Sequence, residues 1–366
     1  MHIYKFIMKT KLVYVLTCSD ENLYLEQALM SVFSARHHNP EAHIVLIVDD
    51  QTDKVIDGNR AEILQYIDEK IVVPFKGEMS MVKRSRWIKT KVRHLIEGDY
   101  LYIDCDTIIR SALKQIDLLE CQIGAVPDSH LEVSDFCAPL YEKISLLSKQ
   151  IGWVIDKEQF YFSSGVIFVK DNANTRNFYE LWHSYWQEGL QKGIAIDQPS
   201  FAKANIAMQH IVEKISDKWN CVMYTEPDFS YNAYILHFPA YRNPSFLFSK
   251  RVLDKIKKEG LKNKFIRQCV IAPDKTYVPF DNKFFKNGIK FYLKTIRCVA
   301  TQAKHYSKNI DPNFEDFIVK SKFSPLIKWH FKNNLFFPGS ILFVLWKFFR
   351  IKFSNNFFYT PNTCQK

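Results

Sequence analysis

The segment YLYIDCDT, residues 100–107, joins a four-residue apolar run directly to two aspartates in an Asp-x-Asp pattern. The apolar run predicts a buried strand, and Asp104 and Asp106 then project to the same side of an extended chain. Two carboxylates so placed can bind one divalent cation, and their hard oxygen atoms suit Mg²⁺ or Mn²⁺. Three such residues also occur in ordinary turns and helix caps, so the pattern gains its meaning from its surroundings.

The surrounding sequence alternates apolar runs with segments of helical periodicity. The predicted strands are Leu12–Leu16, His43–Val48, Ile71–Val73, Tyr100–Ile103, Ile123–Val126 and Phe162–Val169. The predicted helices cover residues 23–36, 60–67 and 82–96. This alternation predicts an α/β fold with a mixed, mostly parallel sheet flanked by helices. Ligands of such sheets bind at the carboxyl ends of the strands, which is where the acidic pair stands.

Composition excludes several other classes of protein. The chain has 366 residues, of which 47% are hydrophobic and 15% aromatic, so it can bury a large core and is not disordered. Only 11 Gly and 14 Pro rule out a collagen-like or low-complexity architecture. The longest apolar tract, Leu335–Trp346, has 12 residues and is interrupted by Pro338, whereas a spanning helix needs about 20, which argues against a polytopic membrane protein.

Charge divides the chain into two parts. Residues 246–366 contain 24 Lys and Arg against 7 Asp and Glu, a local charge of +17 within a net charge of +11. We therefore expect a mildly acidic catalytic domain at 1–245 and a basic, aromatic-rich helical extension at 246–366. Residues 340–353 are apolar with cations near one end, which favours a helix lying on an anionic membrane surface. Packing of that helix on the catalytic domain is the alternative, and no nucleic-acid reader motif is present.

The cysteines and the amino-terminal residues indicate in which cellular compartment the protein is expected. Eight cysteines are scattered without a C-x-x-C pair, which indicates a reduced environment and neither a zinc site nor a disulfide framework. The first 15 residues lack the apolar core and small-residue cleavage site of a signal peptide. We expect a cytoplasmic protein, peripheral at the inner face of a membrane.

Several further segments share their order with a known family. They are LTCSD at 16–20, VDD at 48–50, SRWIK at 85–89, DCD at 104–106, FSSGVIFV at 162–169, DQPSF at 197–201 and ILHF at 235–238. Together these segments resemble the GT-A glycosyltransferases, most closely family 8, the galactosyltransferase and glycogenin-like group. The resemblance covers roughly residues 11–243.

The resemblance implies a metal-dependent transfer of a hexose from a nucleotide sugar, with UDP as the nucleotide. It implies a glycan or lipid-linked acceptor, surface polysaccharide synthesis and a retained anomeric configuration, although the residues alone do not separate retention from inversion. Asp104, Asp106 and His237 match the family's metal ligands. A nitrogen ligand shifts the expected ion from Mg²⁺ towards Mn²⁺.

The resemblance also assigns donor contacts and reacting groups. Asp197 and Gln198 match the family's Asp-Gln pair beside the donor sugar, the catalytic positions. The residues that match donor-binding positions are Thr17, Asp20, Arg86, Lys89, Asp104, Ser164 and Gly165, the last two in a small-residue turn. After His237 the family's Gly and Lys-Pro-Trp are absent, and Arg242 is expected to replace that lysine as the diphosphate cation.

One other chemistry uses an acidic pair after a strand. Phosphatases of the haloacid dehalogenase type carry a nucleophilic Asp followed by Asp-x-Thr or Asp-x-Val. Here Ile108 occupies that last position and Thr107 comes one residue early. A metal-dependent phosphohydrolase acting through Asp104 and Asp106 therefore remains the alternative function.

Overall fold

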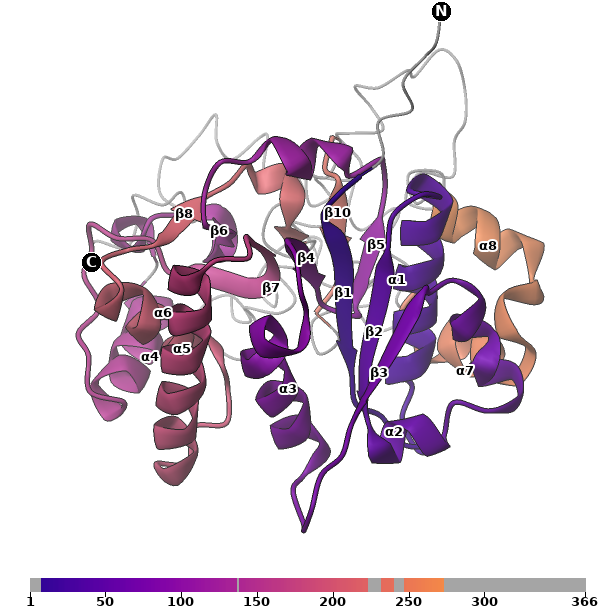
Figure 1. Cartoon of the computed structure of the whole chain (residues 1–366), viewed down its shortest axis with the longest axis horizontal. Coiled ribbons are helices and arrows are strands. Elements are labelled where there is room, and N and C mark those ends of the chain that lie inside the picture. The colour runs from indigo at the N-terminus through magenta and orange to yellow at the C-terminus, as the bar shows by residue number, and fades with distance from the viewer. Residues whose placement is uncertain (1–7, 137, 223–231, 240–246, 273–366) are drawn as a thin grey trace, which may run out of the picture.

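The computed structural model describes residues 8–136, 138–222, 232–239 and 247–272. Its main sheet has the strand order β3-β2-β1-β4-β7-β6-β8 (Figure 1). These strands are β1 Lys11–Leu16, β2 Ile44–Asp49, β3 Glu69–Val73, β4 Tyr100–Ile103, β6 Ile123–Pro127, β7 Phe162–Val169 and β8 Val212–Lys214. Among the described strands of this sheet, only β7 runs antiparallel to its neighbours, β4 and β6. The predicted α/β class with a mixed, mostly parallel sheet is confirmed.

Two of the three predicted helices, at 23–36 and 82–96, are found to within two residues as α1 and α3, and the structure adds others. The described α-helices are α1 Tyr24–His38, α2 Asp50–Lys54, α3 Met81–Leu95, α4 Ala138–Gln150, α5 Ala173–Gln191, α6 Gln198–Ala207, α7 Lys250–Glu259 and α8 Lys264–Ile271. The helix predicted at 60–67 is instead a 3₁₀ helix, η1 Gly58–Gln65. A segment this short gains little from α-helical bonds alone, so its packing against α1 and α7 decides its conformation.

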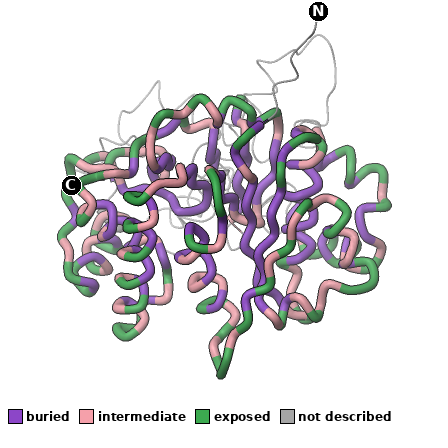
Figure 2. Tube along the Cα trace, in the orientation of Figure 1, coloured by how far each residue is buried: buried purple, intermediate pink, exposed green. Residues whose placement is uncertain are grey.

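The two faces of the main sheet carry separate hydrophobic cores. Leu12 and Tyr14 of β1 pack on the side of α1, whereas Val13 and Val15 pack on the side of α3 and α5. Successive side chains of a strand alternate between faces, so one apolar run serves both cores. Figure 2 shows the central strands buried, with exposed residues on the outer turns and loops.

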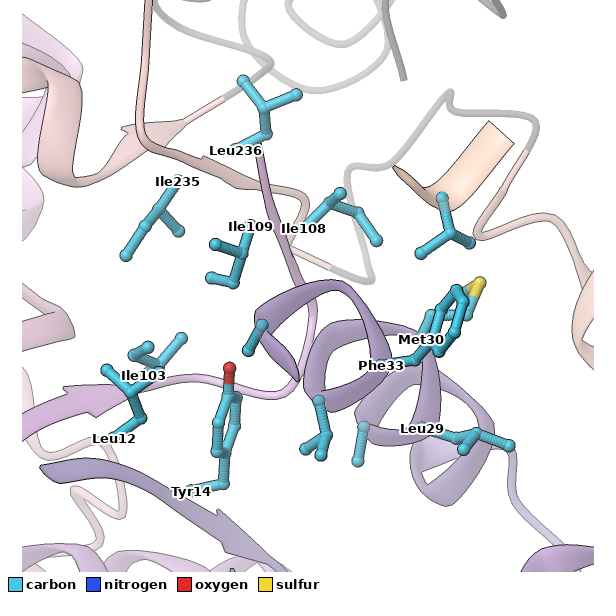
Figure 3. Packing of buried hydrophobic residues seen from close by; sticks show 14 of the residues in the cluster. Leu12, Tyr14, Leu29, Met30, Phe33, Ile103, Ile108, Ile109, Ile235 and Leu236 are labelled. Carbon is cyan, nitrogen blue, oxygen red and sulfur yellow. The ribbon is translucent and has the colours of Figure 1, made fainter. Parts of the chain in front are cut away.

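A second, smaller sheet lies beside the first and consists of β5 Thr107–Ile109, β10 Ile235–His237 and β9 Cys221–Val222, in that order. β5 starts directly after the acidic pair and runs antiparallel to β10, with His237 opposite Thr107. Figure 3 shows how Ile108, Ile109 and Leu236 of this sheet share one apolar cluster with Met30 and Phe33 of α1. The cluster therefore holds the small sheet in register beside the end of β4.

The start of the basic C-terminal segment packs on the N-terminal half of the chain. Val252, Leu253 and Ile256 of α7 are buried in the same cluster as α1. The boundary at 245/246 stays a prediction, but residues 247–272 share the core of the sheet. The apolar helix expected at 340–353 lies outside the described residues. None of the described helices is both long enough and apolar enough to cross a bilayer.

Candidate active site

The acidic pair and the predicted histidine meet at the carboxyl end of β4. The ligand atoms of Asp104, Asp106 and His237 all lie within 4.8 Å of one another. His237 Nε2 is 3.1 Å from Asp106 Oδ1, although the two residues are 131 positions apart in the sequence. Ligands around one ion at about 2.0–2.6 Å lie no more than about 5 Å apart, so the spacing fits a single divalent cation. Two carboxylates and an imidazole are a donor set that suits Mn²⁺.

Gly165 makes this close approach possible. The family resemblance implied a small-residue turn at Ser164 and Gly165, which is wrong, because both lie inside β7, the strand predicted at Phe162–Val169. Gly165 O accepts a hydrogen bond of 2.8 Å from Asp104 N. A Cβ on Gly165 would stand 2.4 Å from His237 Cε1 and 3.1 Å from Asp104 Oδ2. The missing side chain is therefore the space into which the His237 ring fits.

His237 is buried and bonded at both ring nitrogens. Nδ1 lies 2.9 Å from Asn220 Oδ1, and Nε2 faces Asp106. Burial disfavours the charged imidazolium, but the carboxylates of Asp106 and Asp104 outweigh that effect and raise the pKa of His237 above its usual range. The two carboxylates that would share the metal with the ring thus favour its protonated form when no ion is bound.

Asp197 stands at the centre of a second, buried charge cluster. Its Oδ1 is 2.8 Å from Arg86 Nε, and its Oδ2 is 3.1 Å from Lys89 Nζ. Ser164 Oγ donates a hydrogen bond of 2.9 Å to the same Oδ2. Burial alone would raise the pKa of Asp197, but Lys89 and Arg86 hold it far below the usual range. The Asp197 carboxylate is therefore ionised at any physiological pH and cannot serve as a proton donor.

Lys89 joins the two clusters. Its ammonium group lies 3.4 Å from Asp104 Oδ1 and 3.3 Å from Ser164 Oγ, in addition to its contact with Asp197. The side chain is 2% exposed and also lies over the Tyr102 ring. Tyr102 donates a hydrogen bond of 2.5 Å to Asp104 Oδ1. Asp104 is thus oriented by two partners before any ion or substrate arrives.

Gln198 begins α6 directly after Asp197. Its Nε2 donates to Asp128 Oδ2 at 3.1 Å and to Phe162 O at 2.9 Å. Both bonds use the amide nitrogen, and they therefore fix the direction of the side-chain carbonyl. Asp128 follows β6 and Phe162 begins β7, so two neighbouring strands hold the Gln198 side chain.

The remaining predicted donor contacts lie after β1. Thr17 is buried, and its hydroxyl donates to Met81 O at 3.1 Å. Asp20 is exposed, and its Oδ1 lies 3.2 Å from Arg60 Nη1. Both residues occupy the loop at the carboxyl end of β1, and their roles in donor binding stay predictions. Arg242 lies outside the described residues.

The sequence did not predict that several other residues belong to this region. Arg84 stands in a run of cations on α3, yet it is buried and forms an ion pair with the fully buried Asp49. Asn220 follows a tryptophan in a segment without a motif, and Ser163 precedes the predicted Ser164. Only the folded chain shows that Asn220 touches His237 and Ser163 together.

Comparison with known proteins gave matches in structure only. No protein-family model matches the chain, and no curated protein matches it. The galactosyltransferase LgtC in complex with donor and acceptor sugar analogs matches at a TM-score of 0.45 and 16% identity, over 69% of this chain and 95% of that one. An active-site mutant of LgtC matches at a TM-score of 0.43 and 14% identity, over 68% and 95% of the two chains.

Mouse xyloside xylosyltransferase 1, in its apo form, matches at a TM-score of 0.41 and 13% identity, over 62% of this chain and 96% of that one. All three of these structures are glycosyltransferases by name. At these identities and TM-scores the likeness assigns no reaction, so the function has to be inferred from the side chains of this chain.

Proposed function

We propose that this chain is a metal-dependent glycosyltransferase that moves a hexose from a UDP-sugar to a glycan or lipid-linked acceptor. The observation that carries the proposal is the convergence of Asp104, Asp106 and His237 beside the buried carboxylate of Asp197, at the carboxyl end of a mostly parallel sheet. Such an edge is where α/β folds bind nucleotides. The alternation of carboxylates and cations there suits a substrate that carries a diphosphate.

The proposed cofactor is Mn²⁺, or Mg²⁺, held by Asp104, Asp106 and His237. When bound, such an ion neutralises the charge that a leaving nucleoside diphosphate gathers in the transition state. The protein contributes a dry, preorganised setting, since His237 is 6% exposed and Lys89 is 2% exposed. Groups oriented in advance in such a site typically contribute about 10²–10³ in rate each.

Asp197 and Gln198 are the groups that we place beside the reacting sugar. Asp197 is kept ionised by Lys89 and Arg86, so it accepts hydrogen bonds from sugar hydroxyls and stabilises positive charge near the anomeric carbon. Gln198 offers a carbonyl dipole whose direction is set by its bonds to Asp128 and Phe162. Transfer with retained configuration is part of the proposal and is tested by the anomeric coupling constant of the product.

Binding of Mn²⁺ and UDP provides the first test. The melting temperature of the full chain should rise when both are added and rise less with either alone, because the diphosphate and the three protein ligands share the ion. Asp104→Ala should abolish the joint effect. Hydrolysis of p-nitrophenyl phosphate without any response to UDP would instead establish the phosphohydrolase alternative.

A screen of UDP-sugars would then identify the donor. Slow release of UDP in the absence of an acceptor is expected for one sugar above the others, and it should require Mn²⁺ or Mg²⁺. Equal release from every donor, unchanged in Asp104→Ala, would contradict a specific transferase site.

We also propose that the enzyme works at the inner face of a membrane, in surface polysaccharide synthesis, with residues 273–366 on anionic lipid. The support is the charge and aromatic content of the C-terminal segment. The full chain should sediment with anionic vesicles and a chain ending at Ala272 should not. The cut belongs after residue 272, because α7 and α8 pack on α1. Full sedimentation of the shortened chain would overturn this part of the proposal.

A further inference from the structure

Asn220 is a fully buried amide placed between two strands of the candidate site. Its side chain is 0% exposed. Nδ2 donates a hydrogen bond of 3.0 Å to Ser163 Oγ on β7, and Oδ1 lies 2.9 Å from His237 Nδ1 on β10. A buried amide must bond at both ends, and both ends are used here on residues that surround the acidic pair.

The position of Asn220 is set by backbone contacts that do not involve the site. It follows the 3₁₀ helix η5 Asp217–Trp219 and precedes β9, which pairs with β10 in parallel. Its own N–H bonds to Asp217 O at 3.3 Å, and Lys218 O accepts from Tyr234 N at 2.8 Å. The small sheet therefore positions the Asn220 side chain next to the His237 ring.

The His237 ring has two nitrogens that compete for one proton in its neutral form. A metal ion needs the lone pair of Nε2, and the proton then has to stay on Nδ1. The Asn220 carbonyl favours that arrangement because it accepts a hydrogen bond only from a protonated Nδ1. Asp106 Oδ1, 3.1 Å from Nε2, favours the opposite arrangement while the ion is absent.

We infer that Asn220 is a positioning residue that holds the His237 proton on Nδ1 and so presents the Nε2 lone pair to a divalent cation between Asp104 and Asp106. The inference rests on the metal-dependent function proposed above. Asn220 is not one of the three proposed ligands. Its side-chain carbonyl sets the tautomer of His237, which is one of them. Outer partners of this kind usually change metal affinity by about 10–100-fold when removed.

Different residues determine the position of the His237 ring and its tautomer. The backbone of Gly165 confines the ring from one side, since any Cβ there would stand 2.4 Å from Cε1. Asn220 is hydrogen-bonded to the ring at Nδ1, so its effect is on the proton of that nitrogen. A change at Asn220 should therefore alter metal affinity without requiring the strands to move.

The test measures Mn²⁺ affinity of the full chain, by electron paramagnetic resonance of free Mn²⁺ in the presence of UDP. Asn220→Ala should raise the Mn²⁺ dissociation constant by about 10–100-fold. Asn220→Asp keeps an acceptor for Nδ1–H and should restore affinity to within a few-fold of the wild type. Asn205→Ala is the matched control, because Asn205 is also a buried amide but bonds to Val212 N at 2.9 Å. It should lower the melting temperature and leave Mn²⁺ affinity unchanged.

A second readout needs no metal. Nitrogen-15 spectra of labelled histidine, recorded above the pKa of His237, should show a larger share of the tautomer protonated on Nδ1 in the wild type than in Asn220→Ala, where Asp106 alone favours a proton on Nε2. Wild-type Mn²⁺ affinity together with a protonated Nδ1 in Asn220→Ala would overturn the inference. A wild type that binds no Mn²⁺ with UDP would instead overturn the proposed function, while the spectra would still decide the role of Asn220.

Discussion

Replacing Gly165 by alanine should displace His237 from the proposed metal site while leaving the three proposed ligands chemically intact. The added Cβ would lie 2.4 Å from His237 Cε1 and 2.9 Å from its Nδ1, whereas carbon atoms in contact stand about 3.5–4.0 Å apart. The ring must therefore retreat by about 1 Å or more. Metal–ligand distances tolerate only about 0.2 Å, so the retreat should break the bond from Nε2 to the ion.

The expected magnitude follows from this displacement. The variant should lose most of its joint stabilisation by Mn²⁺ and UDP, and its transfer rate should fall by about 10²–10³, the usual effect of losing one electrostatic group. Overpacking should also lower the free energy of unfolding by about 1–3 kcal/mol. The loss of stability by itself says nothing about the site, so a matched glycine is needed.

Gly124 of β6 provides that control. An added Cβ there would lie 2.6 Å from Ile215 Cγ2 and 3.0 Å from Cys121 Sγ, in the apolar core. Gly124→Ala should therefore cost similar stability and keep the wild-type response to Mn²⁺ and UDP in thermal shift. If Gly165→Ala responded as fully as Gly124→Ala, the ring would not depend on the space at residue 165, and our account of the site would be wrong.

Three further predictions concern charge and packing. Lys89→Met removes a buried cation beside Asp197 and should lower the free energy of unfolding by about 3–5 kcal/mol, measured by urea titration. A variant as stable as the wild type would contradict this prediction. The raised pKa of His237 stabilises the metal-free fold below about pH 6.5, and this contribution should fade as pH rises through the folded value. His237→Gln should flatten that part of the stability profile, and an unchanged profile would exclude His237 as its source. Leu253→Ala, in the buried face of α7, should cost about 2–5 kcal/mol, whereas Arg251→Ala on its exposed face should change little, and equal effects would argue against packing of α7 on the core.

The buried face of α7 also shows why the charge division of the chain does not coincide with its packing. Within the described residues 247–272, the cations of α7 and α8 lie at exposed or partly exposed positions, while Val252 and Ile256 are buried in the same cluster as α1. A charge count records only composition, and a helix can be basic on one side and part of the core on the other.

Local patterns predicted every strand of the main sheet except β8, and also the acidic pair of the candidate site. The apolar run of β4 and the Asp-x-Asp after it identified the carboxyl edge, because a strand buries its side chains over consecutive residues and ends where polar ones begin. The order of the motifs along residues 11–243 then led to His237 and Asp197 through family resemblance. Helix type at η1 and the burial of Arg84 did not follow, since both depend on neighbours distant in sequence.

Periodicity and strand-end chemistry act over a few residues, so the sequence alone established the alternating α/β order and the acidic pair. Only folding brought β10 and β7 to that pair, where His237 meets Asp106 and the bare backbone of Gly165 makes room for the ring. The same packing placed Asn220 against His237 and Lys89 between Asp104 and Asp197. Such contacts depend on which strands share a sheet and how closely they approach, and no short stretch of sequence encodes that distance.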